Sequence, residues 1–127
     1  MKPTIAVIGA SPDRFKFGNK CVRAYAAAGY DVYPVHSSAS TVEGLTAYKS
    51  IADVPLDSLD RVSVYLPPAI GVGVMDQIAK KMVGEVWLNP GADGDKVIER
   101  AKQVGLNIIC ACSIVDIGVT PEQFPDS

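Results

Sequence analysis

Short apolar runs rich in Val, Ile and Leu alternate along the chain with longer stretches in which apolar residues recur every three or four positions. Runs of the first kind are typical of strands in a parallel sheet, because both faces of such a sheet are covered. The pattern predicts strands over residues 4–9, 31–35, 61–66, 85–89 and 107–111. It predicts amphipathic helices over residues 18–28, 70–83 and 93–104, and a short helical piece near 49–53 within an irregular segment.

Glycines separate the predicted helices from the strands that follow them. Gly29, Gly84 and Gly105 are each expected to take the left-handed conformation that closes a helix. Asp93 is expected to cap the start of the third helix, and Met75 and Met82 to fill the buried face of the second. Strands alternating with helices predict an α/β fold: a Rossmann-like open parallel sheet of about five strands, with helices on both faces.

Composition and charge narrow the class of protein. The chain has 127 residues, of which 48% are hydrophobic and 20% charged, so we expect residues 1–127 to form a single globular domain. No apolar run approaches the ~20 residues of a membrane span, and the first ten residues do not resemble a secretory signal. Cytoplasmic residence is the resulting expectation. A net charge of −2 argues against nucleic acid or a membrane surface as partner, and leaves a protein partner or a homo-oligomer possible.

The candidate chemistry lies where the strands end, since ligands of open parallel sheets bind at the carboxyl edge. The turn after the first strand leads into a helix whose unpaired amides favour an anion. This turn and its basic surroundings supply the first candidate phosphate-binding residues: Gly9, Ala10, Ser11, Arg14, Lys16 and Asn19.

The residues at the ends of the next strands indicate which nucleotide the site would bind. An NAD site requires an acid at the end of the second strand, yet Asp31 lies at its start and the strand ends with Val35 and His36. After the third strand, Leu66, Pro67 and Pro68 form an apolar wall suited to an adenine or an acyl-chain-like arm. The fourth strand ends in another tight turn, formed by Asn89, Pro90 and Gly91.

The three cysteines, Cys21, Cys110 and Cys112, are an odd number and predict free thiols rather than a disulfide framework. Cys110 and Cys112 lack the further ligands of a zinc site, and nothing places the single histidine, His36, beside them. No metal site is therefore predicted.

The strand-end motifs, taken in order from about residue 3 to 116, resemble the small stand-alone CoA-binding proteins. These are similar to the N-terminal CoA-binding domain of the succinyl-CoA synthetase α subunit. The motifs that carry the resemblance are Gly9-Ala10-Ser11, Pro34-Val35, Val64-Tyr65-Leu66-Pro67-Pro68, Val86-Trp87-Leu88-Asn89-Pro90-Gly91 and Cys112.

The resemblance implies that CoA lies across the carboxyl edge of the sheet. Gly9 and Ser11 would then contact the phosphates, and Val35 and its neighbour would border the adenosine. Pro67 and Pro68 would flank the pantetheine, and Asn89, Pro90 and Gly91 would line the side near the thiol. The chain departs from the family at His36-Ser37, where Asn-Pro is common, and at Asn89, where many relatives carry Gln.

The leading interpretation is a module that binds coenzyme A or acyl-CoA as carrier, sensor or regulatory partner. No Ser/His/Asp set, carboxylate pair or metal cluster points to autonomous catalysis. An NAD(P)-binding oxidoreductase-like or redox protein is the alternative, and a pure interaction protein with a vestigial pocket is a third. Cys112 is either a small buried residue or a thiol that meets the CoA sulfur in a mixed disulfide.

Overall fold

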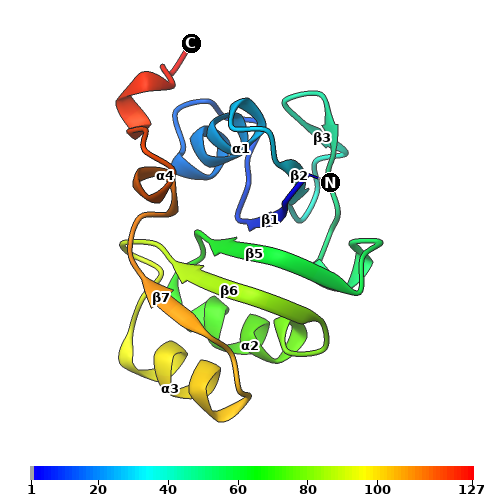
Figure 1. Ribbon diagram of the computed structural model, residues 1–127, viewed down its shortest axis with the longest axis vertical. Coiled ribbons are helices and arrows are strands. Elements are labelled where there is room, and N and C mark those ends of the chain that lie inside the picture. The colour runs from blue at the N-terminus through cyan, green and yellow to red at the C-terminus, as the bar shows by residue number, and fades with distance from the viewer. Residues whose placement is uncertain (1) are drawn as a thin grey trace.

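A five-stranded parallel sheet forms the centre of the computed structural model, which describes residues 2–127 (Figure 1). The strands lie in the order β2-β1-β5-β6-β7. Their bounds are β1 Thr4–Ile8, β2 Asp31–Val35, β5 Ser58–Val64, β6 Met82–Leu88 and β7 Ile108–Cys110. The helices are α1 Phe17–Ala27, α2 Pro68–Ile78, α3 Asp95–Gln103 and α4 Ser113–Asp116. The predicted α/β fold class is confirmed.

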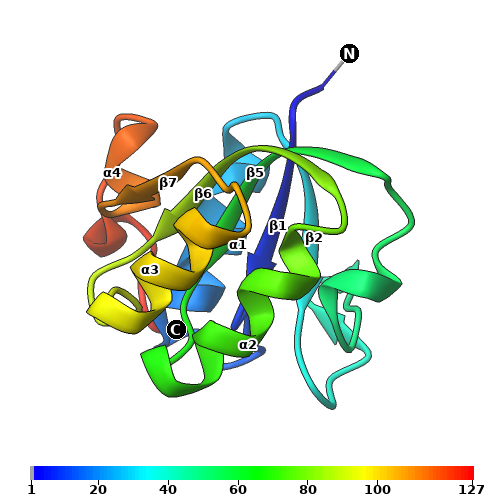
Figure 2. The same ribbon diagram turned by 90° about the horizontal axis from the view of Figure 1, so that it is seen from below.

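Helices cover both faces of the sheet, with α2 and α3 on one side and α1 on the other (Figures 1 and 2). Alternate residues of β1 enter the two resulting cores, because successive strand residues point to opposite faces. Ile5 and Val7 pack in the α1 core, and Ala6 and Ile8 pack in the core beneath α2 and α3. The unbroken apolar run of β1 therefore reflects burial on two sides.

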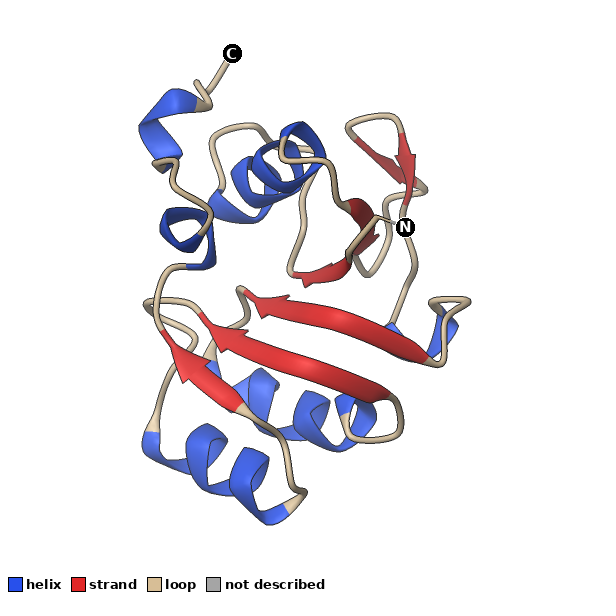
Figure 3. Ribbon diagram, viewed as in Figure 1, coloured by secondary structure: helices blue, strands red, loops and turns tan. Residues whose placement is uncertain are grey.

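The segment between β2 and β5, which was predicted to be irregular, contains a small hairpin and a 3₁₀ turn (Figure 3). The hairpin pairs β3 (Thr41–Val42) with β4 (Leu45–Thr46), and the 3₁₀ turn η1 spans Ile51–Asp53. Turn η1 confirms the helical piece expected near residues 49–53. A second 3₁₀ turn, η2, spans Pro121–Gln123 near the C-terminus.

The order in which strands are added to the sheet reverses at β1, since β2 lies on one side of β1 and β5 on the other. The connections leaving the carboxyl ends of β1 and β5 consequently part from each other at this point. Such a switch point is where an open α/β sheet leaves a crevice for a ligand. The sheet order therefore places the Gly9 turn and the turn after Val64 at the two sides of that crevice.

The prediction for residues 70–83 was wrong at its end. The helix ends at Ile78, and Met82 begins β6, where it pairs with Ser58 and is 77% exposed instead of filling the core. Gly84 lies inside β6 and does not close a helix. A Cβ at this glycine would lie 2.6 Å from the carbonyl oxygen of Asp60, so close strand pairing explains the glycine. Gly29 and Gly105 do have positive φ, as predicted.

The cap predicted for the third helix was also wrong. Helix α3 begins at Asp95 with Gly94 as its N-cap, and no side chain caps it. Asp93 instead accepts a hydrogen bond from the amide of Gly91 at 3.1 Å, within the turn after β6. Its short carboxylate therefore stabilises the turn and does not cap the helix. None of the helices within residues 2–127 is long and apolar enough to cross a membrane.

Candidate functional site

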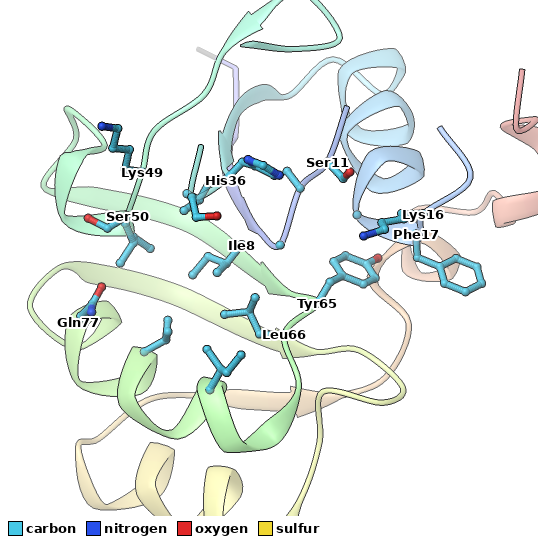
Figure 4. A pocket seen from close by; sticks show the side chains of 18 of the residues that line it. Ile8, Ser11, Lys16, Phe17, His36, Lys49, Ser50, Tyr65, Leu66 and Gln77 are labelled. Carbon is cyan, nitrogen blue, oxygen red and sulfur yellow. The ribbon is translucent and has the colours of Figure 1, made fainter. Parts of the chain in front are cut away.

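A cleft of about 850 Å³ opens at the carboxyl edge of the sheet, at the switch point between β1 and β5 (Figure 4). The ends of β1, β2 and β5, the start of α1, the exposed side of α2 and the segment before η1 all contribute to its walls. Seven of the residues predicted from the sequence line this cleft: Gly9, Ala10, Ser11, Lys16, Val35, His36 and Leu66.

The floor of the cleft depends on two glycines. Gly9 has a φ of +91°, and a Cβ there would lie 2.9 Å from the carbonyl oxygen of Tyr65. Gly18, in the first turn of α1, lies directly against the backbone of Gly9, so that a Cβ there would overlap the Gly9 carbonyl oxygen. These contacts bring the start of α1 against the end of β1.

The first turn of α1 is open towards the cleft. Lys16 is the N-cap residue but its side chain makes no cap, and there is no acidic residue in the first turn. The amides of Phe17 and Gly18 therefore have no partner within the helix. Ser11 is buried beside them, and its Oγ accepts a hydrogen bond from the amide of Asp13 at 3.1 Å. An anion is the natural ligand of such a helix end.

Arg14 does not line the cleft. Its guanidinium makes a two-point contact with Glu43, with Nη2–Oε1 and Nε–Oε2 distances of 2.6 and 3.1 Å. Asn19 is also engaged, because its Nδ2 donates to the carbonyl oxygen of Ser11 at 2.9 Å and to Glu43 at 3.0 Å. Glu43 and Gly44 form the turn of the β3–β4 hairpin, with φ values of 51° and 77°. The hairpin thus braces the loop from β1 to α1.

The hydrogen bonds from Arg14 and then Asn19 lower the pKa of Glu43 from its ordinary value of 4.5 to about 2. Because the folded state holds the carboxylate ionised, this stabilisation is complete above the unfolded-state pKa and disappears as the pH falls through the folded-state pKa. We therefore expect Glu43→Gln to be less stable than the wild type at pH 6, with the difference shrinking between pH 4.5 and about 2.

Urea unfolding of the two proteins at a series of pH values measures this difference. Asp57→Asn is a suitable control, because Asp57 is exposed and forms no ion pair within the described residues. A Glu43→Gln difference that stayed constant down to pH 2 would contradict the proposed bracing by an ionised Glu43.

The remaining basic residues of α1 bind the C-terminal segment. The Lys20 ammonium, which is nearly buried, contacts Asp126 at 2.6 Å and the carbonyl oxygen of Phe124 at 2.7 Å. Arg23 donates to the carbonyl oxygen of Pro125 at 2.8 Å. Of the four basic residues between positions 14 and 23, only Lys16 therefore remains to line the cleft.

The end of β2 forms a second wall. Val35 is buried and supplies an apolar surface, and His36 follows it at the rim. His36 Nδ1 accepts hydrogen bonds from the amides of Ser38 and Ala39 at 3.1 and 2.8 Å. With Nδ1 acting as acceptor, Nε2 is the nitrogen that carries the ring proton and can donate to a ligand.

The charge of the cleft differs from that of the whole chain. The chain carries 14 acidic residues, yet none of them is among the residues that line the cleft. Two lysines line it, Lys16 and Lys49, and Figure 4 shows them at opposite ends. Within residues 2–127 neither lysine takes part in an ion pair. The cleft is therefore suited to an anionic ligand.

Several residues of the cleft were missed by sequence reasoning. Phe15 and Phe17 are 71% and 59% exposed at its rim, although aromatic side chains usually lie inside. Lys49 belonged to a segment without a recognisable motif, and no sequence signal placed it beside β2. The missed lining residues are Ile8, Phe15, Phe17, Gly18, Ser37, Lys49, Ser50, Ile51, Tyr65, Ile70, Val74 and Gln77.

Tyr65 lies at the Lys16 end of the cleft and is largely buried (Figure 4). Burial raises the pKa of its phenol, so the hydroxyl stays protonated. Its oxygen lies 3.5 Å from the Oγ of Ser113, the first residue of α4. Tyr65 therefore brings a neutral hydroxyl group to the site and connects the cleft to the start of α4.

Other predicted residues lie along the same edge but outside the cleft. Pro67 and Pro68 begin α2, while Pro90 and Gly91 form the exposed turn after β6. Asn89 is buried, and its side chain bonds Ser63, Val64 and Ser113. Cys112 is half-buried against the α1 core. Within residues 2–127 there is no cluster of three His, Cys, Asp or Glu side chains able to hold a metal ion.

Comparison with known proteins identifies the family. A family described as CoA binding domain matches residues 3–118. The ADP-forming acetate–CoA ligase of Methanocaldococcus jannaschii is 27% identical over 114 residues, which are 84% of this chain but only 16% of that enzyme. A hypothetical protein from Pyrococcus horikoshii OT3 has a TM-score of 0.82 at 27% identity, with 94% of this chain and 82% of that chain covered.

Part of a larger enzyme is similar as well. In acetyl-coenzyme A synthetase 1 of Ca. Korarchaeum cryptofilum, the similar region has a TM-score of 0.73 at 28% identity and covers 85% of this chain and 26% of that one. The family match, the parallel sheet and the crevice at its switch point agree with one another. The chain belongs to the CoA binding domain family.

Proposed function

We propose that residues 1–127 act as one unit that binds coenzyme A or acyl-CoA in the cleft, as a carrier, sensor or regulatory module without chemistry of its own. The observation that carries this proposal is the site itself, a carboxylate-free crevice at the β1/β5 switch point, with the open end of α1 in its wall. The family match supports the identity of the nucleotide.

The strand order supports a layout for the ligand. Loops that follow β2, β1, β5, β6 and β7 succeed one another along the edge of the sheet. The adenosine would lie over β2 against Val35, and the diphosphate over β1 at the Gly9–Ser11 turn. The pantetheine would then pass Leu66 and the two prolines, and the thiol would point towards the turns after β6 and β7. The sequence-derived candidates follow the order of the parts of CoA.

The NAD alternative is less well supported by the same geometry. Asp31 begins β2 and pairs with Thr4, at the end of the sheet opposite the cleft. No carboxylate among the lining residues can receive the ribose hydroxyls as in a dinucleotide site. The lining residues also include neither a carboxylate base nor a thiol nucleophile, which favours a binding role over catalysis.

Isothermal titration calorimetry with CoA, acetyl-CoA, NAD and NADP tests the proposal. We expect binding of CoA and acetyl-CoA and a much weaker response to NAD and NADP. Lys16→Ala should weaken CoA binding by about ten- to a hundredfold, because a charged hydrogen bond to phosphate contributes about 1.5–3 kcal/mol. Lys96→Ala is the control, since Lys96 is exposed on α3 away from the cleft. Tight NAD binding without a CoA response would overturn the proposal.

A further inference from the structure

We propose that the outer edge of β7 is a dimer interface, at which β7 of a second copy of this chain pairs with it in antiparallel orientation. The β7 edge consists of the backbone groups of Ile108–Cys110 that point away from β6. None of these residues is among those that line the cleft, so the inference goes beyond CoA binding and does not depend on it.

The backbone of β7 has groups available for a further strand. β7 is the last strand of the sheet and pairs with β6 (Figure 1). The amide of Val86 donates to the carbonyl oxygen of Asn107 at 2.8 Å, so the backbone groups of Asn107 point towards β6. Because successive strand residues direct these groups to opposite sides, those of Ile108 and Cys110 point away from β6. No strand of the described chain lies on that side.

The β7 edge lacks the features that usually prevent pairing with another chain. Prolines, charged side chains and covering segments are the common protections of an edge strand. From Leu106 to Val115 the chain has neither a proline nor a charged residue. Cys110 is exposed, and Ile108 and Ile109 are half-buried. After β7 the chain turns towards α1 and does not run back along the edge (Figure 1).

The opposite edge of the sheet, formed by β2, is protected. Pro34 lies within β2 and has no amide hydrogen, and its carbonyl oxygen accepts from the amide of Tyr48 at 2.9 Å. The amide of His36 donates to the carbonyl oxygen of Tyr48, also at 2.9 Å. A contact between β7 and β2 of another copy, which would repeat without end, is therefore disfavoured. A β7–β7 contact is symmetric and closes after two copies.

The positions of the outward-facing groups fix the register of the two strands. Pairing Ile108 of each copy with Cys110 of the other uses both outward-facing residues of both strands in hydrogen-bonded pairs. Ile109 then lies on the two-fold axis, opposite the same residue of the second copy, in a non-hydrogen-bonded pair. Because the segment is uncharged, the symmetry brings no like charges of β7 face to face.

The mass of the full chain as a function of concentration, measured by sedimentation under reducing conditions, tests the interface. We expect a monomer–dimer equilibrium. Cys110→Pro removes an outward-facing amide without breaking the ladder to β6, and should raise the dissociation constant of the dimer at least about tenfold. Cys110→Lys, which keeps the amide and adds a charge at the axis, should weaken the dimer as well. Cys110→Ser is the matched control and should dimerise like the wild type.

A cross-link tests the register. In a protein that carries Cys110→Ser, the further substitution Ile109→Cys would place two thiols across the axis, on Cα atoms about 4.5 Å apart, which is within the range of a disulfide. Oxidation with copper phenanthroline should therefore produce a covalent dimer. Ala111→Cys in the same background is the control, because Ala111 lies two residues away from the axis on each strand and should not cross-link.

Each outcome bears on the interface alone. A wild type that stays monomeric at millimolar concentration overturns it, and so does a dimer that Cys110→Pro and Cys110→Lys leave unchanged while thermal unfolding shows both variants folded. A dimer that Cys110→Ser abolishes would depend on the thiol and not on strand pairing, which also overturns the proposal. Cross-linking through position 111 instead of 109 contradicts the register. CoA titration of the cleft is a separate measurement, so the proposed function stands or falls independently.

Discussion

Gly18→Ala should lower the free energy of unfolding by about 3 kcal/mol, the upper end of the usual cost of overpacking, because the atoms that the new methyl group meets cannot give way. The new methyl group would overlap the carbonyl oxygen of Gly9 and lie 3.2 Å from the Cα of Ala10. All of these atoms belong to the backbone, so no side chain can rotate to make room. Relief requires α1 to move away from the end of β1.

Gly73→Ala is the matched control, because Gly73 is also a helical glycine but has no atom within 4 Å of the added Cβ. It should stabilise the protein by about 0.5–1 kcal/mol, as alanine does in an exposed helix. Urea unfolding measures both variants, and CoA titration of any folded Gly18→Ala protein should show weakened binding. If the two substitutions had similar effects on stability, the close packing of α1 on the Gly9 turn would be refuted.

Asn89→Ala should lower the free energy of unfolding by about 3 kcal/mol, because it leaves buried polar groups without partners and opens a small cavity. The Asn89 side chain donates to Ser63 Oγ at 2.8 Å and to the carbonyl oxygen of Val64 at 2.9 Å. Its Oδ1 accepts from the amide of Ser113 at 2.9 Å. The residue therefore ties β5 and β6 to the start of α4.

Asn107→Ala controls for the loss of an asparagine, since Asn107 is exposed and its side chain donates a single hydrogen bond within the described residues, to the carbonyl oxygen of Gly84. It should change stability by no more than about 0.5 kcal/mol. Chemical unfolding of the two variants in parallel decides the matter. An Asn89→Ala protein as stable as Asn107→Ala would mean that the buried network contributes little, and would leave ligand contact as the reason for the asparagine.

The strands could be predicted because both faces are buried along β1 and along the carboxyl halves of β5 and β6, which produces clear apolar runs. β2 was predicted at its observed bounds, and the others within a few residues. Gly9 could be recognised because a positive φ at the end of β1 admits little else. The end of α2 was missed because Met82 and Gly84 continue the helical pattern, while their true positions are set by pairing with β5, a partner distant in the sequence.

The electrostatics of the site could not be predicted. Arg14, Lys20 and Arg23 look like a phosphate-binding patch in the sequence, yet Glu43 and the C-terminal segment engage them. These partners lie at least 29 residues away from Arg14 and more than 100 from Lys20 and Arg23. Lys49 was missed for the converse reason, since only the bridge at Tyr48 places it beside the cleft.

The C-terminal segment is anchored to α1, so the packed structure extends beyond the residues that match the family. The family match stops at residue 118, but Lys20 is satisfied by Phe124 and Asp126. A protein engineer who grafted this module at the boundary of the match would remove both partners of the Lys20 ammonium and uncover the face of α1 on which the segment lies. A graft that keeps these contacts extends through Asp126.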